Sequence, residues 1–187
     1  MAKKKVERFL SRVRFPNEPY RSVVKNYDAP ENFNPSICAE CGGECCKRCG
    51  CEFSPDDFEE ISFEFLKKEI EKGFITIEMI DSDGYELQDS TLILRMRNKN
   101  SPIVDSQWKK TPCILFTEKG CKLDYAHRPT GGKLLRPSEE KTGTIFRRRR
   151  CSSTYSIESC CYEWWPHQKV LYELAEYFKD KDFPCSI

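Results

Sequence analysis

Six of the chain's cysteines lie within fourteen residues, from Cys38 to Cys51, and this cluster constrains the fold more than any other feature. Their spacing reads Cys-x2-Cys-x3-Cys-Cys-x2-Cys-x-Cys. A Cys-x2-Cys pair on a tight turn directs both sulfurs at one ion, and Gly42 and Gly43 allow the backbone to fold around it. Thiolates are soft ligands that select zinc, Cu(I) or iron–sulfur clusters over Mg²⁺ or Ca²⁺. The cluster therefore predicts a metal site built from cysteine.

Disulfide bonding is the alternative explanation for so many cysteines. Adjacent Cys45 and Cys46, and the closely spaced Cys49 and Cys51, make ordinary disulfide geometry hard to satisfy within the segment. The 12 cysteines among 187 residues also fall short of the roughly 8–10% that is typical of small secreted disulfide scaffolds. The basic N-terminus lacks the apolar run of a secretory signal, and no stretch approaches the roughly 20 apolar residues of a membrane span. We therefore expect a cytoplasmic protein with no membrane contact, whose thiols stay reduced.

Length and composition predict one domain with a modest core. Of the 187 residues, 39% are hydrophobic and 33% are charged, and this length is within the usual size of a single domain. We expect a small α+β domain over residues 36–187, stapled by cysteine-ligated metal, with short antiparallel hairpins, a central helix and a C-terminal helix. Residues 1–35 would form an N-terminal arm. Within it, residues 3–14 predict a short amphipathic helix that packs on the domain by its apolar face, formed by Val6, Phe9, Leu10 and Val13.

Two helices are marked by their sequences. Ser54 is suited to an N-cap, Pro55 to the first helical position, and the carboxylates of Asp56 and Asp57 to the positive end of the helix dipole. A central helix should begin there and end at Gly73. Its buried stripe would consist of Phe58, Ile61, Phe65, Leu66 and Ile70. A second helix is expected over about residues 166–179, where apolar residues again recur at helical spacing.

Two hairpins are predicted between these helices. The β-rich runs 74–80 and 91–97 flank a turn signal at 82–84 and should pair as antiparallel strands. Short strands at 113–116 and 121–124, on either side of a Lys-Gly pair, predict a second hairpin. Cys113 and Cys121 bracket this second hairpin, so it carries two further candidate ligands.

The remaining cysteines extend the candidate set. The candidate metal ligands are Cys38, Cys41, Cys45, Cys46, Cys49, Cys51, Cys113, Cys121, Cys151, Cys160 and Cys161. These sulfurs suffice for one or two sites. A tetrathiolate zinc site and a 4Fe–4S cluster each need four cysteines, so the number of sulfurs does not choose between zinc and iron–sulfur. Cys185, distant from other thiols in sequence, is expected to be a free thiol, and both histidines are expected at the surface.

The order of these motifs resembles the YkgJ family of zinc- or iron-chelating CxxCxxCC proteins. The resemblance rests on the Cys-x2-Cys-x3-Cys-Cys run, the helix start at Ser54, and the later Cys113, Cys121 and Arg128-Pro129, and it covers about residues 36–137. It implies a small domain in which the early cluster and the hairpin cysteines gather on metal, and a cellular role that is undefined for most members. Some relatives are flagellin lysine N-methylases, which makes a methyl-transfer role conceivable.

Gly132 departs from the family pattern, which has a cysteine three residues after the proline of the Arg-Pro pair. One ligand is therefore missing. The candidates to replace this missing ligand are Cys49, Cys51, Cys151 and the Cys160–Cys161 pair. Arg128 would bring a guanidinium near the thiolates and offset part of their negative charge, with a surface turn as the alternative role. Which sulfur binds which metal stays open.

Three function classes follow from these patterns. We expect a metal-binding cysteine-cluster protein that holds zinc or iron–sulfur, and a protein partner is left open. The first alternative is an iron–sulfur redox enzyme or a protein-modifying enzyme of the methyl-transfer type. No catalytic group or phosphate-binding loop identifies it, so whether the chain is an enzyme stays undecided. The second is a nucleic-acid-binding zinc module, based on the basic run 147–150 and the aromatic residues at 162–165, but the formal net charge of +1 disfavours it.

Overall fold

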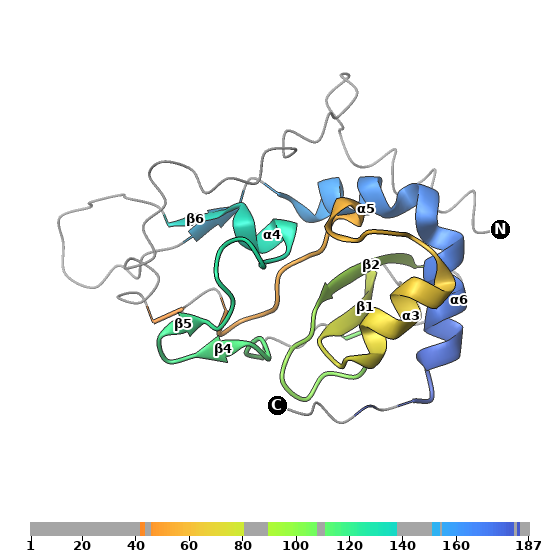
Figure 1. Ribbon diagram of the computed structural model, residues 1–187, viewed down its shortest axis with the longest axis horizontal. Coiled ribbons are helices and arrows are strands. Elements are labelled where there is room, and N and C mark those ends of the chain that lie inside the picture. The colour runs from red at the N-terminus through yellow and green to blue at the C-terminus, as the bar shows by residue number, and fades with distance from the viewer. Residues whose placement is uncertain are drawn as a thin grey trace, which may run out of the picture.

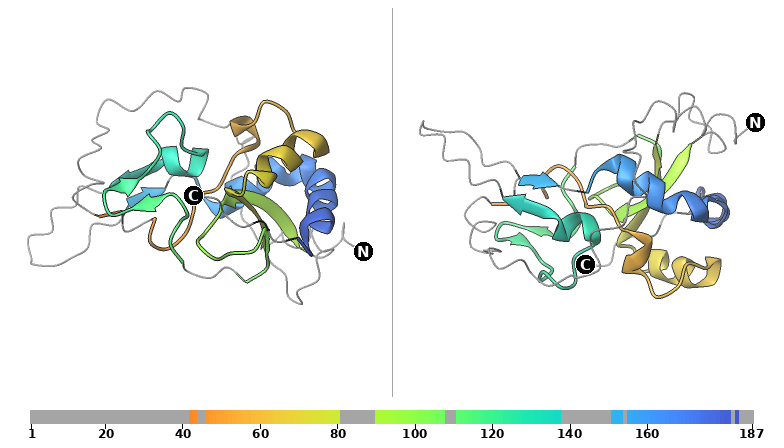
Figure 2. Two further views of the ribbon diagram at one scale, coloured as in Figure 1. Left: turned by 60° about the horizontal axis from the view of Figure 1, so that its bottom comes forward. Right: turned by 90° about the horizontal axis from the view of Figure 1, so that it is seen from above.

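The computed structural model describes residues 42–43, 46–80, 90–107, 111–137, 151–153, 155–181 and 183. Within this part the chain forms a small α+β domain, as the sequence predicts (Figure 1). One side of the molecule is a three-stranded sheet with helices packed on it, and the other side carries two short strand pairs (Figure 2). The predicted N-terminal arm, residues 1–35, and the turn at 82–84 lie outside the described residues.

The predicted central helix is two separate elements, so the expectation of one helix after Ser54 is wrong. Ser54 caps a short 3₁₀ helix, η1 (Pro55–Asp57). Phe58 then has extended backbone, with φ −115° and ψ 145°, and this conformation ends η1. Ser62 provides a second N-cap for α3 (Phe63–Glu71), because its hydroxyl accepts a hydrogen bond from the first turn of that helix.

The sheet is built around the first predicted hairpin. Strands β1 (Ile75–Ile80) and β2 (Thr91–Met96) pair antiparallel with Ile75 opposite Met96, which confirms that prediction. The two-residue strand β3 (Val104–Asp105) adds to β1 in parallel and gives the order β2-β1-β3. A strand of two residues leaves no periodic pattern, so no sequence signal predicted β3.

The predicted C-terminal helix is present as α6 (Gln168–Phe178). It is preceded by α5 (Ile157–Trp164) and by a 3₁₀ turn, η3 (Trp165–His167). Helix α5 is not among the predicted elements, although its N-terminus carries a standard capping signal. The Ser156 hydroxyl accepts a hydrogen bond from the N–H of Ser159 at 3.2 Å.

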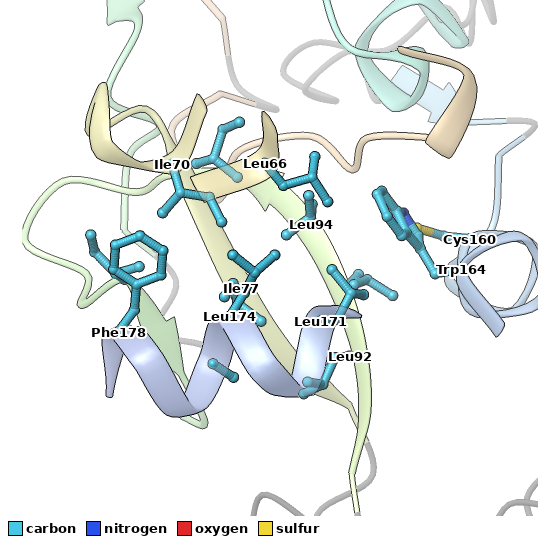
Figure 3. Close-up of a cluster of buried hydrophobic side chains, with 14 of the residues drawn as sticks. Leu66, Ile70, Ile77, Leu92, Leu94, Cys160, Trp164, Leu171, Leu174 and Phe178 are labelled. Carbon is cyan, nitrogen blue, oxygen red and sulfur yellow. The ribbon is translucent and has the colours of Figure 1, made fainter. Parts of the chain in front are cut away.

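Helices α3, α5 and α6 pack with the sheet around one hydrophobic core (Figure 3). Its fully buried members include Leu66, Ile70, Ile77, Leu92, Leu94, Trp164, Leu171 and Leu174. Burial of each such side chain contributes about 1.5–3 kcal/mol. The helices and the sheet on this side of the molecule are therefore held together by an apolar core of their own.

Gln168, at the start of α6, covers one end of the outer edge of β2. Its side-chain oxygen accepts a hydrogen bond from the N–H of Leu92 at 2.9 Å, and its side-chain nitrogen donates to the Leu92 carbonyl at 2.8 Å. The backbone groups that an edge strand leaves open are satisfied here by a side chain. The contact also fixes where α6 begins relative to the sheet.

The second predicted hairpin is present and is shorter than expected. Strands β4 (Phe116–Thr117) and β5 (Gly120–Cys121) pair antiparallel, so the pairing is confined to the two residues nearest the turn. Beside it lies one helical turn, α4 (Thr130–Lys133). Strands β6 (Leu135–Pro137) and β7 (Cys151–Ser153) pair antiparallel next to α4.

In the part of the chain that the structure describes, no helix combines the length and the apolar character needed to cross a membrane.

Candidate metal centre

The second half of the cysteine cluster is bonded to the edge of β2. The N–H of Phe53 donates to the Leu94 carbonyl, and the N–H of Met96 donates to the Cys51 carbonyl, each at 2.9 Å. Residues 51–53 therefore run antiparallel to β2 along its outer edge. In Figure 1 this orange segment passes between the sheet and the small hairpins. Cys51 is thereby held beside the end of β2.

Gly50 brings the chain against β2 at a point where no larger residue fits. A β-carbon at this position would lie 1.9 Å from the Met96 carbonyl oxygen, a distance that only glycine avoids. The N–H of Gly50 donates to the buried side-chain oxygen of Asn98 at 2.6 Å. These two contacts fix the positions of the neighbouring Cys49 and Cys51.

A second segment that carries cysteines is joined to the first by a backbone hydrogen bond. The N–H of Cys113 donates to the Cys46 carbonyl at 2.7 Å. Cys113 also pairs with Asn98 in an isolated antiparallel bridge. The β4–β5 hairpin then reverses the chain, so that Cys121 lies opposite Phe116. Backbone pairing alone thus brings cysteines from distant parts of the sequence to one side of the molecule.

Five cysteines line one cavity between these segments. They are Cys46, Cys49 and Cys51 from the cluster, and Cys113 and Cys121 from the hairpin. The cavity encloses about 50 Å³, which is more space than a single water molecule requires. All five residues belong to the predicted ligand set.

The rest of the cavity wall is apolar apart from one guanidinium group. Met96, Leu115 and Leu123 contribute apolar side chains, and Arg128 contributes the charged side chain. The Nε of Arg128 donates to the Leu123 carbonyl at 3.4 Å. Among the described residues, no carboxylate lines this cavity. Thiol donors without carboxylate oxygens suit zinc, Cu(I) or iron–sulfur and do not suit Mg²⁺ or Ca²⁺.

A complete coordination sphere is not formed by these side chains. Among the residues that the structure describes, no three cysteine, histidine, aspartate or glutamate side chains converge closely enough to hold a metal ion. The seven cysteines described with side chains are thiols. Cys38, Cys41 and Cys45 lie outside the described residues, and Cys45 directly precedes Cys46 in the chain. The metal site therefore stays a prediction.

Cys160 and Cys161 are not brought to this cavity. Both lie on α5 in the hydrophobic core, where their side chains are 0% and 3% exposed. The Cys160 thiol donates to the Phe53 carbonyl at 3.6 Å. Burial raises the pKa of this thiol well above its usual value, which favours the thiol over the thiolate that binds metal. Cys151 lies on β7, where its backbone pairs with Pro137, and Cys185 lies outside the described residues.

A buried ion pair next to the cysteine segment was missed by the sequence analysis. Nη2 of Arg95 on β2 donates to Oε1 of Glu78 on β1 at 2.8 Å, and each residue is 3% exposed. The other carboxylate oxygen of Glu78 is buried and has no hydrogen-bond partner within the described structure. Burial is the main cause that raises the pKa of Glu78 to about 7, and Arg95 opposes the rise. The sequence signal that could have revealed this pair is the presence of charged residues inside the β-rich runs 74–80 and 91–97.

Asp57 joins η1 to α4 and so helps to close the cavity. Its carboxylate accepts hydrogen bonds from the N–H and the hydroxyl of Thr130, at 2.8 and 2.9 Å. Burial raises the pKa of Asp57, while the bonds from Thr130 lower it. The N–H of Gly131 donates to the Glu52 carbonyl at 3.0 Å. The turn that carries Arg128 is thereby held against the cysteine segment.

Gly132, where the YkgJ pattern has a cysteine, lines the same cavity. A β-carbon at this position would lie 3.4 Å from the β-carbon of Arg128 and 3.5 Å from the sulfur of Cys51. Both are ordinary contact distances, so a side chain fits here and would lie next to a thiol. The departure from the family pattern therefore removes a sulfur from the wall of this cavity.

Comparison of the chain with protein-family models, with curated proteins and with solved structures finds no significant match. The resemblance to the YkgJ family rests on the sequence motifs.

Proposed function

We propose that this chain is a cytoplasmic metal-binding protein of the YkgJ type, in which clustered cysteine thiolates hold zinc or an iron–sulfur cluster. One observation carries the proposal: five cysteines from two segments far apart in sequence line a single cavity. The backbone bonds of Cys51 to β2 and of Cys113 to Cys46 hold these segments together.

Thiols that serve only as small core residues have a different environment in this molecule. Cys160 and Cys161 are buried among the apolar side chains of the core. In contrast, Cys46, Cys49 and Cys121 are half-buried and line a cavity that also contains a guanidinium group. Cys113 lines the same cavity but is buried in a small apolar cluster. A cysteine-lined cavity with a nearby positive charge supports thiolates, the form that coordinates metal. Metal binding accounts for this contrast better than simple packing does.

The five lining cysteines would hold the metal together with Cys38, Cys41 and Cys45. Eight sulfurs suffice for one or two four-sulfur centres. Arg128 would offset part of the negative charge of such a centre. A bound metal would cross-link the cysteine cluster and the β4–β5 hairpin. Structural zinc contributes on the order of 10 kcal/mol to the folding of small finger peptides, and we expect less here because the helices and the sheet share a separate core.

An iron–sulfur redox enzyme or a protein-modifying enzyme is the second candidate, and one observation favours it. An open groove of about 530 Å³ lies next to the cavity and shares Met96, Leu115 and Leu123 with it. Binding sites for substrates are concave and mostly apolar, and this groove has both properties. Its position would place a bound molecule against the wall of the metal centre.

The nucleic-acid alternative gains no comparable support. Trp164 is 0% exposed, and its indole N–H donates to the Phe53 carbonyl at 2.7 Å. Trp164 is therefore a core residue and is not available to stack on a base, whereas Tyr162, another of the aromatic residues behind this alternative, is 45% exposed. The basic run 147–150 lies outside the described residues.

Anaerobic purification followed by elemental analysis tests the proposed function. Colourless protein that contains zinc supports a structural or chelating role, whereas brown protein with broad absorption near ~400 nm indicates iron–sulfur and favours the redox candidate. Cys51→Ser should lower the metal content. Cys160→Ser, a matched change at a core thiol, should leave the metal content unchanged. Protein without bound metal, or equal loss of metal in the two variants, would contradict the proposal.

A further inference from the structure

Cys46 and Cys113 lie far apart in the sequence and next to each other in the fold. The N–H of Cys113 donates to the carbonyl oxygen of Cys46 at 2.7 Å. A direct backbone bond of this kind holds the two α-carbons roughly 5.5 Å apart. Disulfides form between residues whose α-carbons are about 4.4–6.8 Å apart. The chain path therefore already has the spacing that a disulfide between these two residues needs.

The two side chains also share one environment. Both residues line the cavity that the five cysteines surround. Cys113 is a buried member of the small apolar cluster that includes Met96, and the half-buried Cys46 packs against that cluster. Because the two thiols border the same space, rotation of their side chains is the motion that brings the sulfurs together. The backbone bond between the residues can stay in place.

Other cysteine pairs of the described structure have less suitable settings. Cys49 and Cys51 are two residues apart, and Gly50 between them lies against β2 with no room for a β-carbon. This contact opposes the tight turn that a bridge between Cys49 and Cys51 would require. Cys160 and Cys161 are neighbours on α5 within the core, and adjacent side chains of a helix do not face each other.

The two thiols differ in exposure, and this difference assigns an order to their reactions. Cys113 is 5% exposed, whereas Cys46 is half-buried. A small molecule from solution therefore reaches the sulfur of Cys46 first, since the rate of thiol–disulfide exchange depends on access. Cys113 lies beside it, where it can react with Cys46 and is shielded from solution.

We propose that Cys46 and Cys113 form a reversible disulfide by exchange with a small disulfide such as oxidised glutathione. The Cys46 thiolate attacks one sulfur of the small disulfide, which breaks its S–S bond, releases one small thiol and leaves a mixed disulfide at Cys46. The Cys113 thiolate then attacks the Cys46 sulfur and displaces the second small thiol. The protein loses two protons and two electrons, and the small disulfide is reduced to two thiols.

The disulfide would control the proposed metal site, and this part of the inference rests on the proposed function. Cys46 and Cys113 are both candidate ligands, so their oxidation withdraws two sulfurs from the metal, and bound metal withholds the same thiolates from exchange. The disulfide would also replace the metal as a cross-link between the cysteine cluster and the segment before β4. In metal-free protein, formation of the disulfide does not depend on the proposed function.

Oxidation of the metal-free full chain in glutathione buffers, followed by alkylation and trypsin digestion, tests the disulfide. Trypsin cleaves between Cys46 and Cys49 and between Cys113 and Cys121, so mass spectrometry distinguishes these thiols. We expect a cross-linked pair of peptides that contain Cys46 and Cys113. Folded protein should become oxidised in a buffer at least about tenfold more reducing than urea-unfolded protein requires, because the fold aligns the two thiols.

Serine variants separate this pair from the other thiols of the cavity. Cys46→Ser and Cys113→Ser should each abolish the cross-link in metal-free protein, whereas Cys51→Ser, a matched change in the same cavity, should retain it. In Cys113→Ser the mixed disulfide should persist at Cys46, which adds the mass of one glutathione to the chain. A cross-link to Cys49 or Cys121 instead, a cross-link that survives Cys46→Ser, or no cross-link at all would overturn the proposal.

The same oxidation of metal-loaded protein distinguishes this inference from the proposed function. Metal at about ten times its dissociation constant should slow cross-linking about tenfold. If metal-loaded protein forms the cross-link as fast as metal-free protein and keeps its metal, control of the metal site by the disulfide is overturned. If the parent protein binds no metal, the proposed function fails, while a cross-link between Cys46 and Cys113 in that sample still supports the disulfide. A cross-link that is lost on dilution would join two chains and would refute it.

Discussion

The N–H of Cys113 donates to the carbonyl oxygen of Cys46 at 2.7 Å, and the side chains of both residues line the same cavity. Two candidate ligands are therefore aligned by a bond between their own backbones. This bond is independent of the sulfur atoms, so replacement of either thiol keeps the chain path. Serine variants at these positions consequently report on ligation with little change in the surrounding fold.

Metal removal should lower stability without abolishing helical structure. The larger core, formed by α3, α5, α6 and the sheet, contains none of the five cysteines. Within the described residues, the hairpin side has a smaller cluster, whose buried members are Met96, Cys113, Ile114 and Leu115. We expect apo-protein, prepared with a chelator under anaerobic reducing conditions, to keep most of its far-ultraviolet circular dichroism and to melt roughly 10 °C or more below the metal-bound protein. Identical melting temperatures would show that the metal has no structural role.

Asn98 should be essential for the position of the cysteine segment. Its side-chain oxygen accepts the hydrogen bond from the Gly50 N–H in a buried environment. Asn98→Ala leaves that donor unsatisfied, and we expect the free energy of unfolding to fall by about 1–3 kcal/mol. Asn98→Asp keeps an acceptor at the same place and separates the loss of the hydrogen bond from the loss of volume. Urea denaturation measures the effect, and a loss below about 0.5 kcal/mol in the alanine variant would contradict it.

Gly50 and Gly132 should respond in opposite ways to alanine. A β-carbon at position 50 would lie 1.9 Å from the Met96 carbonyl, whereas one at position 132 would keep ordinary contact distances. We expect Gly50→Ala to destabilise the protein by several kcal/mol, on the order of severe overpacking. Gly132→Ala, within the helical turn α4, should be neutral or stabilising by up to about 1 kcal/mol. Thermal unfolding of the two variants side by side measures this difference.

The buried Glu78 predicts a pH dependence of stability. Its pKa is raised from 4.5 to about 7 in the folded protein, mainly because of burial. Between these two values the folded state binds more protons than the unfolded state, so the free energy of unfolding falls as the pH rises. A shift of this size corresponds to a loss on the order of 3 kcal/mol by about pH 8. This loss of stability is absent at pH values well below 4.5, the pKa of Glu78 in the unfolded state, because Glu78 is then protonated in both states.

Glu78→Gln removes this titration and should flatten the dependence between about pH 5 and pH 8. It keeps an acceptor for Arg95, so the hydrogen bond at that position is retained. Glu64→Gln, which removes one carboxylate at an exposed position, is the matched control. Urea denaturation at several pH values measures the slope. The same slope in Glu78→Gln and the parent would assign the pH dependence to other groups.

Local signals in the sequence predicted much of the fold. The β-rich runs at 74–80 and 91–97 pair as expected, and Gly73, with φ 84°, ends α3 as expected. The central helix was predicted as one element because its apolar spacing continues through Phe58 and Ile61. The break depends on the extended backbone of Phe58 and the second cap at Ser62, and periodicity does not detect such a break.

The five cysteines that line the cavity were among the candidate ligands predicted from the sequence, but their arrangement in space was not predicted. Spacing alone identified Cys46, Cys49 and Cys51 as a group, and the hairpin signal indicated Cys113 and Cys121. Cys160 and Cys161 were included because they could complete the coordination of the metal, but α5 places both in the core. Whether these cysteines face the core or a metal site depends on how their helix packs on the sheet, and the spacing of cysteines in the sequence does not show this packing. The Glu78–Arg95 pair was missed for the same reason, since charged residues inside strands show their partner only once the strands are in register.

Because residues 51–53 pair with the edge of β2, the oxidation state of the cysteine cluster affects the tendency of the protein to aggregate. Leu94 and Met96 have their outward backbone groups covered by this segment. If the segment detaches, a buried apolar strand gains an open edge on which another chain can add a strand of its own. Oxidative damage to the thiols that loosened this segment would therefore convert a local chemical lesion into self-association of the whole molecule.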